Sequence, residues 1–167
     1  MKIHQRAEVW VLVLGCVAAA VWVLMDGASD PAAGSAAPGP VTAAEPLRIH
    51  RCTLERDYGN ARLDIELRYQ NDSPRPLTLQ PPDARLLTGS GDDVPPFVLP
   101  VEPPPSVAAG TAQDVRLRFW LEEEHLAGSL TLEIRDTSAP VKSGAPFNLE
   151  RLENGKPRSW TGTDWSP

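Results

Sequence analysis

Cysteine is scarce in this chain, and its scarcity excludes one common way of stabilising a small extracellular domain. The 167 residues include two cysteines, Cys16 and Cys52. Cys16 lies inside a long apolar run, whereas Cys52 lies in the later, more polar part of the chain, so we expect no disulfide bond between them. A disulfide framework is therefore excluded, and a hydrophobic core must stabilise the fold.

Signatures of catalysis are also missing. No serine lies in a Gly-x-Ser-x-Gly elbow. The segment "GSGDD" at 89–93 lacks the lysine of a P-loop and the ligand spacing of an EF-hand. Both methionines lie within the first 25 residues, which excludes a methionine-based copper carrier in the later part of the chain. We expect a protein that is not an enzyme and that uses no cofactor.

The charge pattern has no strong bias toward one sign. The net charge is −6, and acidic and basic residues alternate throughout the chain without a block of lysines or arginines. A nucleic-acid-binding surface normally requires a basic patch or stripe. We therefore expect no nucleic-acid partner.

One long hydrophobic run occupies residues 9–25 and contains no charged side chain. As a helix with a rise of roughly 1.5 Å per residue it would span about 25 Å. This is at the short end of what a bilayer core of about 30 Å requires. Trp10 and Trp22 lie near its two ends, where tryptophan favours the membrane–water boundary. The run therefore predicts a single transmembrane helix.

Charges on the two sides of this run predict its orientation. Lys2 and Arg6 precede it, whereas Asp26 and Asp30 follow it. The positive-inside rule then puts residues 1–8 in the cytoplasm and the rest of the chain outside. Because the excess of arginine over lysine and the alanine and proline bias are typical of a high-GC bacterium, we expect an inner-membrane protein whose C-terminal part lies in the periplasm.

Two other interpretations of the run remain open. A cleaved signal peptide would need a shorter apolar stretch followed by a small-residue cleavage site. A lipoprotein would be cleaved before Cys16, but the apolar run continues well past that residue. The retained anchor is favoured because Cys16 lies in the middle of the run. Processing would instead make the protein a secreted or lipid-anchored binding protein.

The rest of the chain divides into a linker, a β domain and a tail. Residues 26–46 are rich in proline, alanine and glycine, which is typical of a flexible to semi-extended linker. Alternating apolar and polar residues then predict half-buried strands. The predicted strands are 47–55, 61–71, 76–80, 84–88, 96–101, 114–121 and 129–134. The prolines between residues 95 and 105 restrict 96–101 to an edge strand or to an extended connection between sheets. Seven short strands over 47–136 predict an all-β sandwich, and 137–167 is predicted to be a tail.

The segments "LDIELRYQNDSPRPLTL", "PSVAAGTAQDVRLRFWL" and "GSLTLEI" follow one another in this region. In this order they resemble the small immunoglobulin-like domains that many bacterial extracytoplasmic proteins carry behind a lipid or helix anchor. The resemblance covers roughly residues 47–135 and implies an interaction or accessory module. The chain lacks the Cys…Trp…Cys triplet of antibody domains.

Three residues are weak candidates for a metal site. His50 and Cys52 are two residues apart on a predicted strand, and this spacing puts both on one face. Together with His125 from a distant loop they could bind copper or zinc. The simpler interpretation is a buried cysteine and a surface histidine, because no second Cys–His spacing supports a metal site.

Three tryptophans are candidates for partner binding. Trp120 follows Phe119 on a strand and should point away from the core, where either the C-terminal segment covers it or a partner contacts it. Trp160 and Trp165 lie in the tail and should either dock on the domain itself or bind a partner. We expect a non-catalytic accessory module of a cell-envelope complex with an unidentified protein partner; the alternative is a metal-handling domain.

Overall fold

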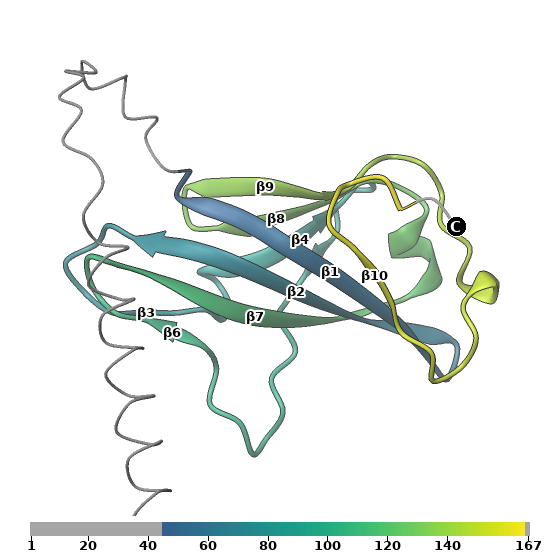
Figure 1. Cartoon of the computed structure of the whole chain (residues 1–167), viewed down its shortest axis with the longest axis horizontal. Helices are drawn as coiled ribbons and strands as arrows, with labels where there is room; N and C mark the ends of the chain where they lie inside the picture. Colours follow the sequence, from purple (N-terminus) through teal and green to yellow (C-terminus); the bar gives the residue numbers. More distant parts are fainter. Residues whose placement is uncertain (1–44, 166–167) are drawn as a thin grey trace, which may run out of the picture. The chain divides into compact units, whose positions relative to one another are not determined.

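Residues 45–165, the part of the chain that the computed structural model describes, form antiparallel β-sheets (Figure 1). This confirms the prediction of an all-β fold. The strands and the two short 3₁₀ turns are β1 (Leu47–Asp57), β2 (Asn60–Asn71), β3 (Leu77–Thr78), β4 (Ala84–Thr88), β5 (Asp93–Val94), β6 (Ser106–Val107), β7 (Thr111–Leu121), η1 (Glu123–Leu126), β8 (Leu130–Ile134), β9 (Thr137–Lys142), η2 (Leu149–Arg151) and β10 (Arg158–Trp160).

The first sheet has the strand order β10-β1-β2-β7 and contains the longest strands of the described region. Along β2 every second residue from Ala61 to Tyr69 is buried, while the intervening arginines and acids face outward. This alternation is the signal that predicted a strand over 61–71, because successive side chains of a strand point to opposite faces.

A two-residue turn joins β1 to β2. Tyr58 and Gly59 both have positive φ angles, 47° and 89°, and Asp57 pairs with Asn60 across the turn. Two central residues with positive φ characterise the type I′ hairpin turn, whose twist matches that of the flanking strands. The turn brings Glu55 opposite Arg62 and so sets the register of the charged outer face.

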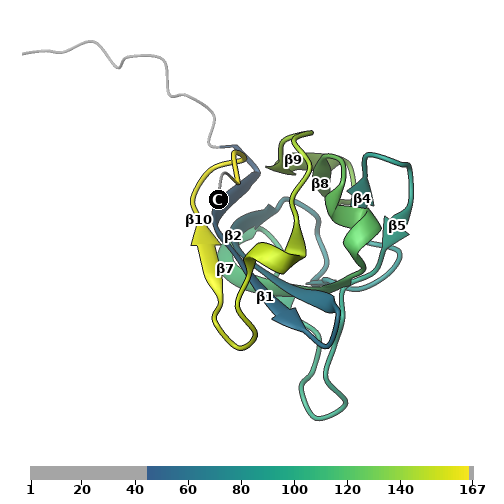
Figure 2. The same ribbon diagram turned by 90° about the vertical axis from the view of Figure 1, so that its right-hand side faces the viewer.

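The second sheet has the order β5-β4-β8-β9 and faces the first (Figure 2). Side chains from both sheets form one hydrophobic core, including Leu63 and Ile65 from β2, Phe119 from β7 and Leu132 from β8. A small two-stranded sheet, β3-β6, adds Leu77 and Val107 to this core. The burial of these side chains replaces the disulfides that the sequence lacks.

The β structure continues beyond residue 136, where the sequence analysis ended the domain. β9 pairs with β8, and β10 pairs with β1 through Cys52 and Trp160. The alternation is weak here because Pro140 interrupts β9 and because β10 has only three residues. Two segments of the predicted tail, 137–142 and 158–160, thus belong to the two sheets.

Residues 96–101 form a connection rather than a strand. Pro96 makes an isolated bridge to Phe119, and the segment then leaves the sheets in a long loop before β6 (Figure 1). Prolines lack the backbone N–H that a continuous ladder needs. Of the two interpretations left open for this segment, the extended connection is confirmed.

The predicted regions 1–8 and 9–25, and nearly all of the predicted linker 26–46, lie outside the described residues. Between residues 45 and 165 there is no helix with the length and apolar character needed to cross a bilayer.

Candidate interaction surface

His50 and Cys52 lie on opposite faces of β1, although their spacing predicted one common face. The pairing of β1 with β2 shifts between Ile49 and Arg51, which leaves His50 as the extra residue of a β-bulge. A bulge reverses the alternation of side chains beyond it. His50 is consequently exposed and lies 3.3 Å from the Asp114 carboxylate, whereas Cys52 faces the core.

Cys52 is buried, with 2% of its surface exposed. Burial raises the pKa of its thiol to about 12, because the thiolate would lose its hydration. His125 lies in the 3₁₀ turn η1, where its Nδ1 accepts a hydrogen bond from the backbone N–H of Glu122. The three candidate metal ligands are therefore not brought together. No group of three or more His, Cys, Asp or Glu side chains in residues 45–165 is arranged to hold a metal ion.

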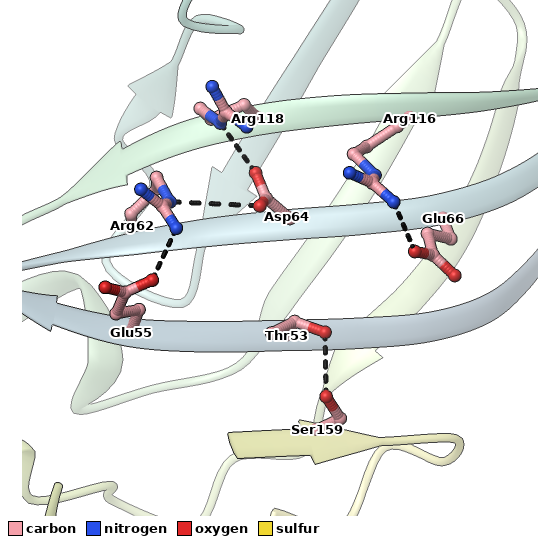
Figure 3. Close-up of polar contacts among 8 residues, drawn as sticks. All are labelled: Thr53, Glu55, Arg62, Asp64, Glu66, Arg116, Arg118 and Ser159. Atoms are coloured by element: carbon pink, nitrogen blue, oxygen red, sulfur yellow. Dashed lines mark hydrogen bonds and ion pairs between the residues drawn. The ribbon is translucent and has the colours of Figure 1, made fainter. Parts of the chain in front are cut away.

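The outer face of the first sheet carries a network of ion pairs (Figure 3). Arg118 Nε donates to Asp64 Oδ1 at 2.7 Å, and Arg116 Nη2 donates to Glu66 Oε1 at 2.8 Å. The hydrogen bond to Asp64 raises the pKa of Arg118 above its usual range. Arg62 pairs with Glu55 as well. Opposite charges face each other across β1, β2 and β7, so this face is largely neutralised within the sheet.

Trp120 lies at the end of this face and is 36% exposed. Its ring contacts Phe97, with the ring centroids 6.2 Å apart and the planes inclined by 49°. Phe97 belongs to the loop after β5, so part of the cover that the sequence analysis expected from the C-terminal segment is provided by this loop. The sequence analysis missed Phe97, although an aromatic residue in a proline-rich segment was the available signal.

The loop at residues 95–105 projects away from both sheets in the two views (Figure 1, Figure 2). Val101 at its tip is 88% exposed, and Glu102 N donates to Leu99 O at 3.0 Å to close the turn. A hollow between this loop and β7 is lined by Pro96, Leu99 and Leu117, with Arg116 and Arg118 beside them. We name Phe97, Val101 and Trp120 the loop patch.

Trp160 and Trp165 pack against each other and against their own domain. Their rings are stacked with centroids 5.0 Å apart and an interplanar angle of 12°, and Phe147 meets both rings edge-on. Trp165 is 5% exposed and belongs to the hydrophobic core, as does Leu149 of the η2 turn. The structure therefore shows Trp160 and Trp165 docked on their own domain. A role of these two residues in binding a partner stays a prediction.

Comparison of the chain with protein-family models, with curated proteins and with solved structures finds no match. The arguments on function therefore depend on the chemistry and geometry of the chain itself.

Proposed function

We propose that this chain is a non-catalytic interaction module of the bacterial cell envelope, and that the loop patch contacts its protein partner. The observation that supports this proposal is the clustering of exposed apolar side chains. Among the described residues four large hydrophobic side chains are exposed; two of them, Phe97 and Trp120, are in contact, and Val101 belongs to the same loop as Phe97. Exposed aromatic residues that cluster in this way are enriched at the energetic centres of protein interfaces.

The strand order supports an immunoglobulin-like topology for this module. β1, β2 and β7 correspond in order to strands A, B and E of that fold, and β4, β8 and β9 correspond to C, F and G. β10 adds a further strand beside β1. Such sandwiches present loops and edges on a rigid core, which suits them to binding rather than to chemistry.

The experiment that tests the patch is recovery of partners from cells that express the full-length chain. Phe97→Ala and Trp120→Ala should each lose a partner that the unmodified protein retains. Tyr58→Ala is the matched control, because Tyr58 is a fully exposed aromatic residue of the β1–β2 turn and does not belong to the loop patch. An identical set of partners for all four proteins would refute the role of the patch.

We further propose that residues 9–25 anchor the domain to the inner membrane with its C-terminal part in the periplasm. The charge-free run and the positive charges before it support this topology. Fusing a reporter enzyme that is active only outside the cytoplasm to the C-terminus should give an active fusion. The mass of the protein in the membrane fraction should be that of the full chain. Loss of residues 1–15, or of about 20 to 29 residues, would instead indicate lipidation or signal-peptide cleavage.

A further inference from the structure

The edge of β7 that faces away from β2 is open over half of the strand. Arg118 O accepts a hydrogen bond from Phe97 N at 2.6 Å, so this carbonyl points away from β2. The β2–β7 register runs without a shift from Thr111 to Leu121. The backbone N–H and C=O groups of successive strand residues point to alternate sides of the strand. The backbone groups of Ala112, Asp114 and Arg116 therefore point to the same open side as those of Arg118. Residues 45–165 provide no strand that pairs with β7 there.

Exposure agrees with an accessible edge. Residues Thr111 to Asp114 are all exposed, including Gln113, whose side chain points to the inner face, and Arg116 is exposed as well. An unpaired strand edge with accessible N–H and C=O groups can accept an extended chain as an additional strand. At the far end of β7 this edge is already paired, because Pro96 forms a bridge to Phe119 and Phe97 N donates to Arg118 O.

The charges on β7 define what an added strand should carry. On the paired side, Glu66 lies opposite Arg116, and Arg68 lies opposite Asp114 with Nη1 3.2 Å from Oδ2. Both β7 side chains remain well exposed, at 59% for Arg116 and 65% for Asp114. A strand that runs antiparallel to β7 on its open side would, like β2, lie opposite Arg116 first and opposite Asp114 two residues later. It should therefore carry an acidic residue and, two residues later, a basic one.

The inner face of β7 adds a requirement for an apolar residue. The residue that precedes the acid would lie opposite Leu117, which is buried on the inner face of the sheet. We infer that the open edge of β7 binds an extended segment of a partner protein with the pattern apolar–acidic–apolar–basic, by strand addition. This inference rests on the proposed role of the domain as an interaction module and names the chemistry of its partner.

A second copy of this chain fits the same edge poorly. Pairing Asp114 of one copy with Arg116 of the other in an antiparallel arrangement would bring Ala112 opposite Arg118. The carbonyl of Arg118 is already bonded to Phe97. The register that satisfies the charges is therefore blocked, and a partner segment that ends before this point is favoured.

The test uses two synthetic peptides and the full-length protein in detergent micelles. The peptide acetyl-IELRYQ-amide copies residues 65–70 of β2 and carries the inferred pattern. Its control, acetyl-IRLEYQ-amide, has the same composition with the acid and the base exchanged. Backbone amide NMR should show that Ala112, Asp114 and Arg116 shift on addition of the first peptide, and their hydrogen exchange should slow. Binding of the first peptide should be about tenfold tighter, because exchanging the acid and the base turns two attractive cross-strand charge pairs into two repulsive ones.

Charge reversal gives the decisive variant. Asp114→Arg combined with Arg116→Glu should reverse the preference, so that acetyl-IRLEYQ-amide binds more tightly. Equal binding of both peptides, or no shift of the three amides, would overturn the inference. So would slow exchange of these amides without peptide, since this would mean that another part of the chain covers the edge. A concentration-dependent dimer that uses the same amides would assign the edge to a second copy and would also overturn it.

The inference and the proposed function fail in distinguishable ways. Asp114→Pro removes an N–H that points to the open side, and proline is tolerated at such edge positions. If partner recovery from cells survives Asp114→Pro but is lost with Trp120→Ala, the interaction module stands and strand addition is refuted. The amide spectrum of Asp114→Pro verifies that the sheets remain folded.

Discussion

At the scale of single residues, Asn71 connects three separate parts of the chain. Its Nδ2 donates to Arg75 O at 2.9 Å and to Val107 O at 3.0 Å, and its Oδ1 accepts from Ser73 Oγ at 2.7 Å. The side chain is fully buried at the end of β2. It donates to backbone carbonyls on both sides of the β3–β6 sheet, so its amide stabilises the turns after β2 and before β7.

Replacing Asn71 should destabilise the domain. Asn71→Ala removes the hydrogen bonds of a buried amide to Arg75 O and Val107 O, which costs about 1–3 kcal/mol. Asn71→Asp should cost at least as much, because a carboxylate oxygen would face those carbonyls without a donor. Urea denaturation of the full-length protein measures both. Gln70→Ala serves as the neighbouring control and should stay within about 0.5 kcal/mol of the unmodified protein; similar values for all three would contradict the role of Asn71.

Cys52 should be nearly inert toward thiol reagents in the folded protein. Raising its pKa from 9.0 to about 12 lowers the thiolate fraction at pH 8 by roughly a thousandfold. The greater nucleophilicity of a more basic thiolate offsets part of this loss, which leaves a rate at least about 30-fold lower than for an unperturbed thiol. A Cys16→Ser variant isolates the reaction of Cys52. Equal labelling rates in native buffer and in denaturant would show that the thiol is accessible.

At the scale of elements, β9 ends in a charged residue that the sequence analysis did not single out. Lys142 is 2% exposed, and its Nζ donates to Gly128 O at 2.6 Å, to Ser143 O at 3.0 Å and to Ala145 O at 2.5 Å. It thereby ties the segment after β9 to the turn before β8. Burial lowers the pKa of this ammonium group, because the charged form loses hydration.

The lowered pKa of Lys142 predicts a pH dependence of stability. The unfolded lysine keeps its proton up to about 10.5, so between the lowered native pKa and that value the unfolded state binds more protons. Stability therefore rises with pH over this window. Lys142→Met should cost about 1–3 kcal/mol by leaving carbonyls unpaired and should remove this rise. Denaturation curves of both proteins at several alkaline pH values measure the difference, and a constant difference would contradict the prediction.

The aromatic cluster of Phe147, Trp160 and Trp165 holds the C-terminal segment against the sheets. Trp165→Ala should cost roughly 3 kcal/mol, as is typical of removing a buried tryptophan, and should make the segment after β9 sensitive to proteases. Trp120→Ala is the matched comparison, because Trp120 is half-exposed and should cost much less. Unchanged stability of Trp165→Ala would favour the alternative that this residue serves a partner.

At the scale of the whole β domain, the two sheets need strands from both ends of the described region. Residues after 136 contribute Val141, Phe147, Leu149 and Trp165 to the core. A chain ending at Asp136 loses β9 and β10 and exposes the apolar side chains that they cover. It should therefore show no cooperative unfolding transition, whereas a chain ending at Trp165 should unfold as the full protein does. Denaturation followed by circular dichroism compares them; a cooperative transition for the shorter chain would restore the boundary at 136.

Alternation in the sequence was sufficient to find the strands that cross the middle of the sheets. Segments 61–71, 114–121 and 129–134 each bury one face, and the burial of one face imposes the period of two that can be read directly. The edge strands β9 and β10 bury fewer side chains, and Pro140 interrupts the period in β9. Their pairing depends on partners distant in sequence, so local periodicity could not reveal it.

The sequence by itself determined the all-β class, the scarcity of cysteine and the position of the long apolar run. All three follow from composition and from local periodicity. Only the tertiary structure decided which residues meet. A single bulge in β1 separates His50 from Cys52, and the loop at residues 95–105 brings Phe97 onto Trp120. The open edge of β7 likewise exists because the prolines before β6 leave the sheet rather than pair with it, which depends on contacts between residues far apart in the chain.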